Sequence, residues 1–213
     1  MYENEKQAII EAGITLDRYG LIALSGGNIS VRTAKNEILM TPSGMIYEQL
    51  SSDDIVVMDL NGKIIEGNRR PSVDNEAIRY IFSKREDLNA VIHTHQPYAT
   101  AIGLVDDEIP CNLTTLANAT RGAVKVAPYS SAASLEMGIE TVENLGEQLA
   151  VVLKHHGVIT VGDKLKQALY AAVYLEEAAK TLVLAKAYGG EKVAELTEEQ
   201  IQTAVDIFKS YGQ

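Results

Sequence analysis

The stretch Asn89-Ala90-Val91-Ile92-His93-Thr94-His95 sets the expectations for both the fold and the site. A short apolar run with β-branched residues leads directly into two histidines, which is typical of a buried strand. Side chains two positions apart on a strand point to the same face, so His93 and His95 are expected to reach one metal ion together. The stretch therefore predicts a buried strand that carries a pair of metal ligands.

The other two of the chain's four histidines are adjacent, at His155-His156. They close the apolar run 149–153 and are followed by Gly157, so we expect a strand over 149–155. Because adjacent strand residues face opposite ways, only one of the two histidines is expected to join the site. The two tight groups together indicate one imidazole-rich place in the folded chain.

Three neutral imidazoles around an ion with one open position are typical of a catalytic zinc site. Structural zinc sites are usually closed and rich in cysteine, and the single Cys111 cannot make one. The alternative is that each histidine is an ordinary polar residue, satisfied at the end of a strand. The doubled pattern favours metal binding, because imidazole is a preferred ligand of zinc and its neighbours.

Composition limits the classes of function. A chain of 213 residues with 46% hydrophobic residues is expected to form one domain, residues 1–213, with a substantial core. The net charge of −10 argues against a nucleic-acid partner, because such binding relies on clustered Lys and Arg. No apolar run approaches the ~20 residues of a membrane span. One cysteine and no secretory signal pattern favour the cytoplasm.

Helical and strand periodicity predict how the chain is organised. We expect helices over 3–19, 75–84, 98–104, 134–147, 164–188 and 197–208. Strands are expected over 29–32, 37–40, 55–60, 63–65, 89–95, 122–128 and 149–155, with Asn61-Gly62 as a hairpin turn. Hairpins mixed with helices predict an α/β domain with a largely antiparallel central sheet flanked by helices, rather than repeated parallel βαβ units.

Three loops combine small donor residues with turn formers, so their backbones can approach an anion closely. A compact phosphate can be held by backbone NH groups and hydroxyls whatever the overall charge. Taken singly, each loop has a composition that is also typical of an ordinary turn. The first loop lacks the spacing of a P-loop or of a dinucleotide fingerprint. The loops are Ser25-Gly26-Gly27-Asn28-Ile29-Ser30, Thr41-Pro42-Ser43-Gly44 and Arg70-Pro71-Ser72-Val73-Asp74.

A metal ion that polarises a carbonyl needs a nearby base, and Asp74 is the leading candidate. It lies where the third loop enters a predicted helix, so the same segment can touch phosphate and metal. An ordinary helix N-cap is an equally good interpretation of Asp74, because Asp is favoured at that position. Glu76, two residues later, is the competing carboxylate.

Taken together, these motifs resemble the class II aldolase and adducin family, and within it most closely the L-fuculose-1-phosphate aldolases. The resemblance runs nearly end to end and rests on the order and spacing of several motifs. They are Gly27-Asn28-Ile29-Ser30, Thr41-Pro42-Ser43-Gly44, Pro71-Ser72 followed by Asp74, His93-Thr94-His95, His155-His156-Gly157 and the terminal Phe208-Lys209-Ser210-Tyr211-Gly212.

The resemblance implies roles for particular residues. By position, the implied zinc ligands are His93, His95 and His156, with Asp74 as the proton-transferring group that can also ligate the ion. The implied phosphate-binding residues are Gly27, Asn28, Ser43, Gly44 and Ser72. Tyr211 is similar to the C-terminal tyrosine that acts as an acid at the aldehyde oxygen.

The resemblance also implies an activity: cleavage of a ketose 1-phosphate, such as L-fuculose 1-phosphate, to dihydroxyacetone phosphate and an aldehyde, here L-lactaldehyde. Family members form cyclic homotetramers with sites between subunits, so a homotetramer acting on a small sugar phosphate is implied.

Several positions keep two alternatives open. Asp rather than Glu at Asp74 is similar to the L-ribulose-5-phosphate 4-epimerases, and Val73 replaces the second serine of its turn. The segment 112–115 lacks the tyrosine of the aldolases, whereas Asn118 stands where the epimerases carry an acid. We rank aldolase first and epimerase second. A non-catalytic scaffold of the adducin kind ranks third, because the metal triad is complete.

Overall fold

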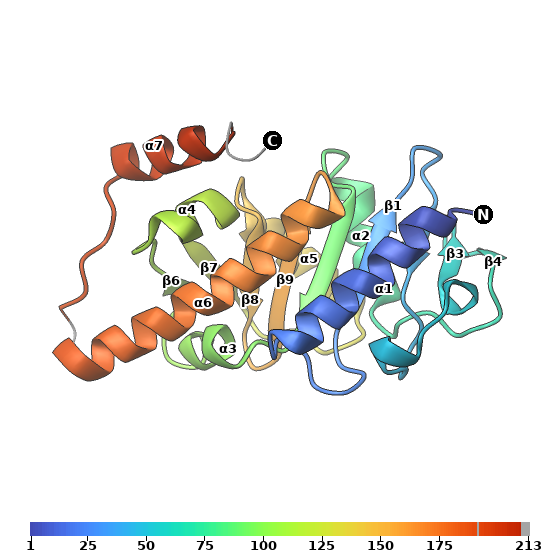
Figure 1. Ribbon diagram of the computed structural model, residues 1–213, viewed down its shortest axis with the longest axis horizontal. Coiled ribbons are helices and arrows are strands. Elements are labelled where there is room, and N and C mark those ends of the chain that lie inside the picture. Colours follow the sequence, from blue (N-terminus) through green and yellow to red (C-terminus); the bar gives the residue numbers. More distant parts are fainter. Residues whose placement is uncertain (191, 210–213) are drawn as a thin grey trace.

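A nine-stranded sheet runs through the part of the chain that the computed structural model describes, residues 1–190 and 192–209 (Figure 1). The strand order is β4-β3-β2-β1-β5-β9-β8-β7-β6. Neighbouring strands are antiparallel except for β7 and β8, which pair in parallel. The predicted α/β class with a largely antiparallel sheet is therefore confirmed.

The strands are β1 (Asn28–Arg32), β2 (Ile38–Met40), β3 (Val56–Met58), β4 (Ile64–Glu66), β5 (Ala90–Thr94), β6 (Glu108–Ile109), β7 (Val124–Ala127), β8 (Ala150–Leu153) and β9 (Gly157–Gly162). The α-helices are α1 (Glu3–Arg18), α2 (Asn75–Lys84), α3 (Pro97–Gly103), α4 (Thr114–Thr120), α5 (Leu135–Leu145), α6 (Leu165–Gly189) and α7 (Glu198–Lys209). Two short 3₁₀ turns, Tyr47–Gln49 and Ser52–Asp54, precede β3.

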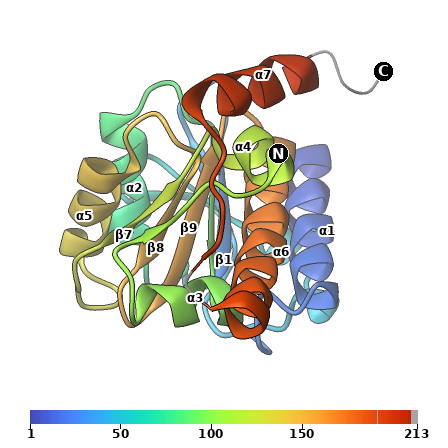
Figure 2. The same cartoon turned by 90° about the vertical axis from the view of Figure 1, so that its left-hand side faces the viewer.

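Helices cover both faces of the sheet, as Figure 2 shows in a view from one side edge of the sheet. α2 and α5 pack on one face, while α1 and α6 pack on the other, with α3 and α4 beside α6. The packing follows from amphipathic helix faces; in α2, for example, Ala77, Ile78, Ile81 and Phe82 are all buried. Both faces of the sheet are therefore covered by helices.

β5 lies near the middle of the sheet and is buried along its whole length. Val91 packs into the core on the α2 and α5 side, whereas Ala90 and Ile92 pack on the α1 and α6 side. A strand that is buried on both faces has a continuous apolar run rather than an alternating one, which explains the sequence Ala90-Val91-Ile92 before the histidines. The strand ends at Thr94, so the two histidines lie at the end of this central strand.

The second histidine pair does not lie on a strand, and this part of the prediction is wrong. β8 ends at Leu153, the turn 154–156 reverses the chain, and β9 begins at Gly157. No strand is predicted from the sequence over 157–162, although Val158-Ile159-Thr160-Val161 is rich in β-branched residues. A polar turn between two apolar runs is a hairpin pattern, so the histidines lie in the turn of a hairpin rather than at the end of a single strand.

α4 and β6 are also absent from the predicted elements. α4 is seven residues long and contains three threonines, which are weak helix formers. It packs against α6 and α7, so tertiary contacts outweigh its low intrinsic preference. The remaining predicted helices and strands are present, with ends that differ by a few residues. Across the described ranges, no helix combines the length and apolarity needed to cross a membrane.

Candidate metal centre and phosphate cavity

Three of the four histidines meet at one end of the sheet. His93 lies in β5, His95 follows the end of that strand, and His156 comes from the turn between β8 and β9. Each offers a ligand nitrogen, and these atoms all lie within 4.8 Å of one another. The ring centroids are separated by 4.9 Å for His93 and His95, 4.6 Å for His93 and His156, and 5.5 Å for His95 and His156.

Hydrogen bonding fixes the tautomer of His93. Its Nδ1 lies 3.0 Å from the carbonyl oxygen of Val158, which can only accept, so Nδ1 carries the proton and donates. The lone pair is then on Nε2, which lies 3.1 Å from Nε2 of His95. Zn–N bonds of about 2.0–2.1 Å at tetrahedral angles place two ligand nitrogens roughly 3.3 Å apart. The spacing of the two Nε2 atoms therefore fits a shared cation.

The surroundings keep the imidazoles neutral, the form that binds metal. Burial lowers the pKa of His93 to about 3, and the neighbouring rings of His156 and His95 add to this. Burial is also the main cause that lowers the pKa of His95 and of His156. His156 Nδ1 is buried without a hydrogen-bond partner among the described residues, a cost that a bound cation or water would remove.

Two glycines allow the backbone to approach the histidines closely. A Cβ on Gly157 would collide with the carbonyl oxygen of Thr94 and would lie 3.2 Å from Cε1 of His93. A Cβ on Gly27 would collide with the carbonyl oxygen of His93, and Gly27 also has a φ of +71°. Both glycines therefore support the triad by leaving room for it.

His155 turns away from the other three. It is exposed, its φ is +62°, and its ring centroid lies 6.3 Å from that of Tyr129. The prediction that only one histidine of this pair joins the group is confirmed, but its reason is different. The selection comes from the left-handed backbone of the turn and not from alternation along a strand.

Asp74 stands at the N-cap position of α2, yet its side chain does not cap the helix. Its Oδ2 accepts a hydrogen bond of 2.7 Å from Nδ2 of Asn28, and its Oδ1 accepts one of 3.1 Å from the backbone N–H of Ala133. The carboxylate is thus buried and oriented from two distant segments, whereas Glu76 is exposed. Asp74 is not among the metal-ligating atoms within 4.8 Å of one another, which come from the three histidines.

The histidines, Asp74 and the small-residue loops line one cavity of about 190 Å³. Of the five predicted phosphate-binding residues, Gly27, Ser43, Gly44 and Ser72 line it. The other lining residues are Ser25, Gly26, Pro42, Val73 and Ala132. Ala132 belongs to a loop, 128–134, that is not among the three predicted from the sequence, although its serines and small neighbours resemble those of the other loops.

Asn28 is the predicted phosphate-binding residue that does not line the cavity. It is buried at the start of β1, opposite His93 in the sheet register. Its amide donates one hydrogen bond to Asp74, and an amide group has two donor hydrogens. Its Oδ1 is buried with no partner in the described part of the chain. The geometry adds an orienting contact with Asp74 that the sequence did not predict.

Sequence comparison decides the family. Residues 7–183 match the family described as Class II Aldolase and Adducin N-terminal domain. The chain belongs to the class II aldolase and adducin family. It is an enzyme of the metal-dependent lyase class that characterises these aldolases. The resemblance identified from the motifs is thereby confirmed.

Relatives of the chain carry three different names. The 5-deoxy-D-ribulose 1-phosphate aldolase of Bacillus thuringiensis serovar kurstaki is 31% identical over 214 residues, covering 100% of this chain and 99% of the relative. The L-fuculose phosphate aldolase of Escherichia coli (strain K12) is 32% identical over 204 residues, covering 96% and 94%. The L-ribulose-5-phosphate 4-epimerase UlaF of Salmonella paratyphi C is 32% identical over 193 residues, covering 85% of each chain.

The fold of this class II aldolase family member agrees with solved structures. An L-fuculose 1-phosphate aldolase superposes with a TM-score of 0.89 at 30% identity, covering 96% of this chain and 95% of that one. Class II aldolases use a divalent metal, and the histidine triad of this chain can hold one.

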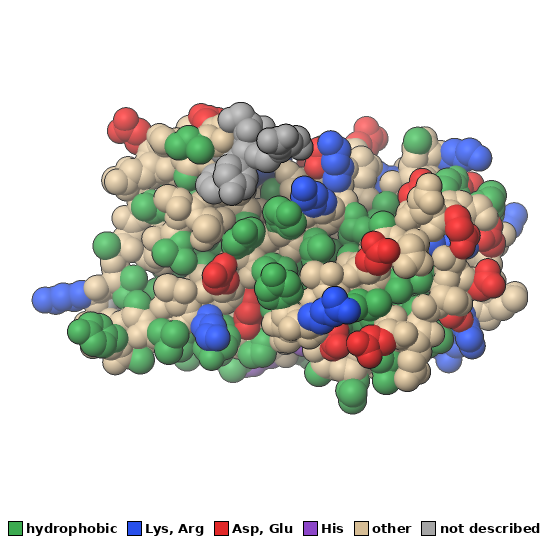
Figure 3. All heavy atoms as spheres, viewed as in Figure 1, with side chains coloured by type: hydrophobic (Ala, Val, Ile, Leu, Met, Phe, Trp, Pro, Cys, Tyr) green, Lys and Arg blue, Asp and Glu red, His purple; other side chains and the backbone are tan. Residues whose placement is uncertain are grey.

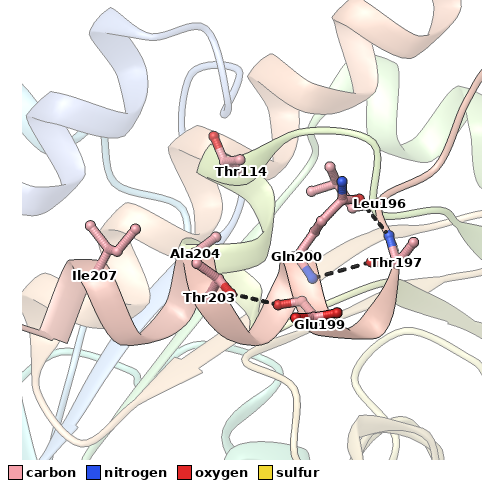
Figure 4. A pocket seen from close by; sticks show the side chains of 8 residues that line it. All are labelled: Thr114, Leu196, Thr197, Glu199, Gln200, Thr203, Ala204 and Ile207. Atoms are coloured by element: carbon pink, nitrogen blue, oxygen red, sulfur yellow. Dashed lines mark hydrogen bonds between the residues drawn. The ribbon is translucent and has the colours of Figure 1, made fainter.

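A larger cavity of about 620 Å³ lies where α7 packs near the start of α4 (Figure 4). It is lined by Thr114, Leu196, Thr197, Glu199, Gln200, Thr203, Ala204 and Ile207. Two of its polar side chains bond to nearby backbone groups: Gln200 Oε1 accepts from the backbone N–H of Thr197, and the Thr203 hydroxyl donates to the carbonyl oxygen of Glu199. With one carboxylate and neither histidine nor cysteine, this lining offers no comparable chemistry.

The two cavities lie at opposite ends of the strands. Figure 1 shows α7 above the sheet, and Figure 3, in the same orientation, shows histidine atoms at the lower edge of the molecule. Tyr211, predicted to act at the aldehyde oxygen, lies outside the described residues, so its role stays a prediction.

Proposed function

We propose that the chain is a zinc-dependent aldolase that cleaves a ketose 1-phosphate to dihydroxyacetone phosphate and an aldehyde. The observation that carries this proposal is the single cavity in which the histidine triad, Asp74 and three small-residue loops converge. L-Fuculose 1-phosphate, which would give L-lactaldehyde, is the first candidate substrate. The name of the Bacillus relative adds 5-deoxy-D-ribulose 1-phosphate, which would give a two-carbon aldehyde.

The phosphate is assigned to the small-residue loops. Backbone N–H groups at Gly27 and Gly44, with the hydroxyls of Ser43 and Ser72, would donate to its oxygens. Asn28, which does not line this cavity, is assigned to the orientation of Asp74 beside it. Because Val73 replaces a serine, its position would contribute through the backbone alone.

His93, His95 and His156 would hold the cation, which we assign as zinc because imidazole suits it and the set leaves an open position. When bound, it would act as a Lewis acid on the substrate ketone. Tyr211, as a phenolate, would take the proton from the C4 hydroxyl as the C3–C4 bond breaks and the aldehyde forms, and the resulting phenol is the acid for the reverse direction. Asp74, held by Asn28 and Ala133 and carrying one proton, would deliver that proton to C3 to give dihydroxyacetone phosphate, and exchange of one proton through solvent would return both groups to their starting states.

Tyr211 requires a neighbouring subunit in this proposal. α7, which ends two residues earlier, lies at the end of the sheet away from the histidines (Figure 1). We therefore assign Tyr211 to the cavity of an adjacent subunit in a homotetramer. Mixing Asp74→Asn and Tyr211→Phe subunits tests this, since mixed oligomers would contain some complete sites. Recovered activity is expected, and mixtures no more active than either variant alone would contradict the assignment.

The first experiment assays the zinc-loaded protein with L-fuculose 1-phosphate, 5-deoxy-D-ribulose 1-phosphate and L-ribulose 5-phosphate. Dihydroxyacetone phosphate that forms with either 1-phosphate and stops with chelator is the expected result. Xylulose 5-phosphate from the third substrate alone would contradict the aldolase and support the epimerase. His155→Ala is a control variant: it should bind as much zinc as wild type, because His155 is exposed and outside the cavity.

The epimerase is the second candidate because Asp stands at position 74 and because relatives of the chain include proteins named as epimerases. Asn118 weighs against it, because it stands where the epimerases carry an acid and an amide cannot act as a base. A non-catalytic scaffold would not need the complete triad, so we do not favour it. The acidic chain remains without a proposed nucleic-acid or membrane partner, and the cytoplasm remains its proposed location.

A further inference from the structure

A carboxylate from α6 caps the helix that follows the first histidine pair. Glu176 is almost fully buried, with 9% of its surface exposed. Its Oε1 accepts a hydrogen bond of 2.8 Å from the backbone N–H of Tyr98, and its Oε2 accepts one of 3.0 Å from that of Ala99. These are early N–H groups of α3, which begins at Pro97 and has no side-chain cap from Gln96. Glu176 therefore supplies this cap from a distant helix.

The same helix holds the intervening residue. Gln96 is fully buried, and its Nε2 donates a hydrogen bond of 2.9 Å to the carbonyl oxygen of Ala172, about one turn before Glu176 on α6. On the other side, the backbone N–H of His95 donates a bond of 3.0 Å to the carbonyl oxygen of Leu21. The segment from His95 to Ala99 is thus tied to α6 and to the loop after α1.

These ties begin where the sheet stops. β5 ends at Thr94, so the backbone of His95 is beyond the ladder that fixes His93. The orientation of its imidazole depends on how the next residues are held. Burial raises the pKa of Glu176, while the two N–H donors and Lys180 oppose that shift. An anion at a helix N-terminus is also favoured by the helix dipole.

We propose that α6 positions the metal centre through Glu176, together with the tie from Gln96 to Ala172: the cap of α3 and this tie fix the backbone after His95 and thereby set that imidazole within reach of the shared ion. The proposal rests on the metal site assigned under the proposed function. Groups that orient metal ligands from outside the coordination sphere typically change metal affinity or activity about 10–100-fold when they are removed. Glu176 bonds the backbone N–H groups of Tyr98 and Ala99, so it acts on His95 through the backbone and not through the imidazole itself.

The test compares Glu176→Gln with Glu177→Gln. Both remove one carboxylate from the same turn of α6, but Glu177 is exposed. In Glu176→Gln, the new amide would keep one acceptor oxygen and place an NH₂ donor against a backbone N–H. The zinc dissociation constant is measured by competition with a chromophoric chelator, far below the melting temperature, and the absorption spectrum of the Co²⁺-substituted protein reports the ligand geometry.

We expect Glu176→Gln to raise the zinc dissociation constant about tenfold and to change the Co²⁺ spectrum. Glu177→Gln should stay within about twofold of wild type, because exposed charge changes have small effects. Equal affinity and identical spectra in both variants would overturn the positioning role. Wild-type protein that binds no zinc would instead overturn the metal site itself, so the two failures are distinguishable.

A second variant covers the case in which Glu176→Gln does not fold. Gln96→Met removes the tie to Ala172 while leaving the cap of α3 in place. Losing one hydrogen bond of typical net strength should weaken zinc binding roughly threefold. Unchanged affinity in this variant would likewise overturn the proposal that α6 positions His95.

Discussion

The two cavities at opposite ends of the strands differ in size and, more importantly, in the side chains that line them. The larger, about 620 Å³, lies between α4 and α7, and its lining contains one carboxylate and no histidine or cysteine. The smaller, about 190 Å³, collects three imidazoles, a buried carboxylate and small-residue loops, and it leaves His156 Nδ1 without a partner among the described residues. The kind of side chain that lines a cavity, rather than its volume, therefore distinguishes the candidate metal site.

The largest expected effect separates the two adjacent histidines. His156→Ala should weaken zinc binding by more than about 100-fold, beyond the loss typical of outer-shell partners, and abolish aldolase activity. Zinc at 100 times its dissociation constant should stabilise wild type by about 2.7 kcal/mol and leave this variant unchanged, as thermal melts will report. His155→Ala should behave like wild type, because that side chain is exposed. Equal losses in both variants would show that the turn, and not the ligand, matters.

Asp74→Asn tests the carboxylate of the small cavity. The amide keeps the shape of the side chain but cannot transfer the proton, so kcat should fall about 10²–10⁴-fold. Zinc affinity should change only a few-fold, since Asp74 lies outside the group of ligand atoms. Glu76→Gln is the control, because Glu76 is exposed on the first turn of α2. A large loss of zinc affinity in Asp74→Asn would make Asp74 a ligand as well.

Gly157→Ala tests whether close backbone approach shapes the triad. The added Cβ would collide with the carbonyl oxygen of Thr94, and overpacking of this kind costs about 1–3 kcal/mol. Urea denaturation should show that loss, together with weaker zinc binding. Gly189→Ala is the control at the end of α6, where nothing lies within 4 Å of the new Cβ. There the change should be neutral or slightly stabilising, since Ala is the better helix former.

Sequence alone predicts the parts of this site that depend on local pattern. The apolar run into His93 and His95 predicts both the strand and the pairing of the side chains, because strand alternation is a local rule. The meeting of His156 with them is a long-range contact, and only the grouping of the histidines and the family resemblance point to it. Its local reason, a left-handed turn at His155, is not encoded by a glycine or asparagine and so leaves no signal in the sequence.

Asp74 shows the same limit. Its position at the start of α2 is predicted, but sequence cannot decide between a helix cap and a catalytic carboxylate. The decision lies in Asn28 and in the backbone of Ala133, which are distant along the chain. The second of these partners is a main-chain group, so no residue type marks it. The loop of Ala132 does carry serines and small residues like those of the predicted loops, but nothing local in the sequence relates it to Asp74.

The smallest effect is expected in the larger cavity. A substitution there should leave the reaction unchanged, and a loss of activity would contradict the contrast between the two cavities. Thr203→Val removes the hydroxyl that donates to Glu199 and leaves the side-chain volume nearly unchanged. Thr203 is exposed on α7, and surface substitutions usually change stability by less than about 0.5 kcal/mol. Zinc affinity and kcat/KM should equal those of wild type, because the lining of this cavity contains none of the groups assigned to the reaction. A fall of tenfold or more in kcat/KM, with stability and oligomeric state unchanged, would mean that this cavity takes part in catalysis itself, in addition to the role proposed for Tyr211 beyond α7.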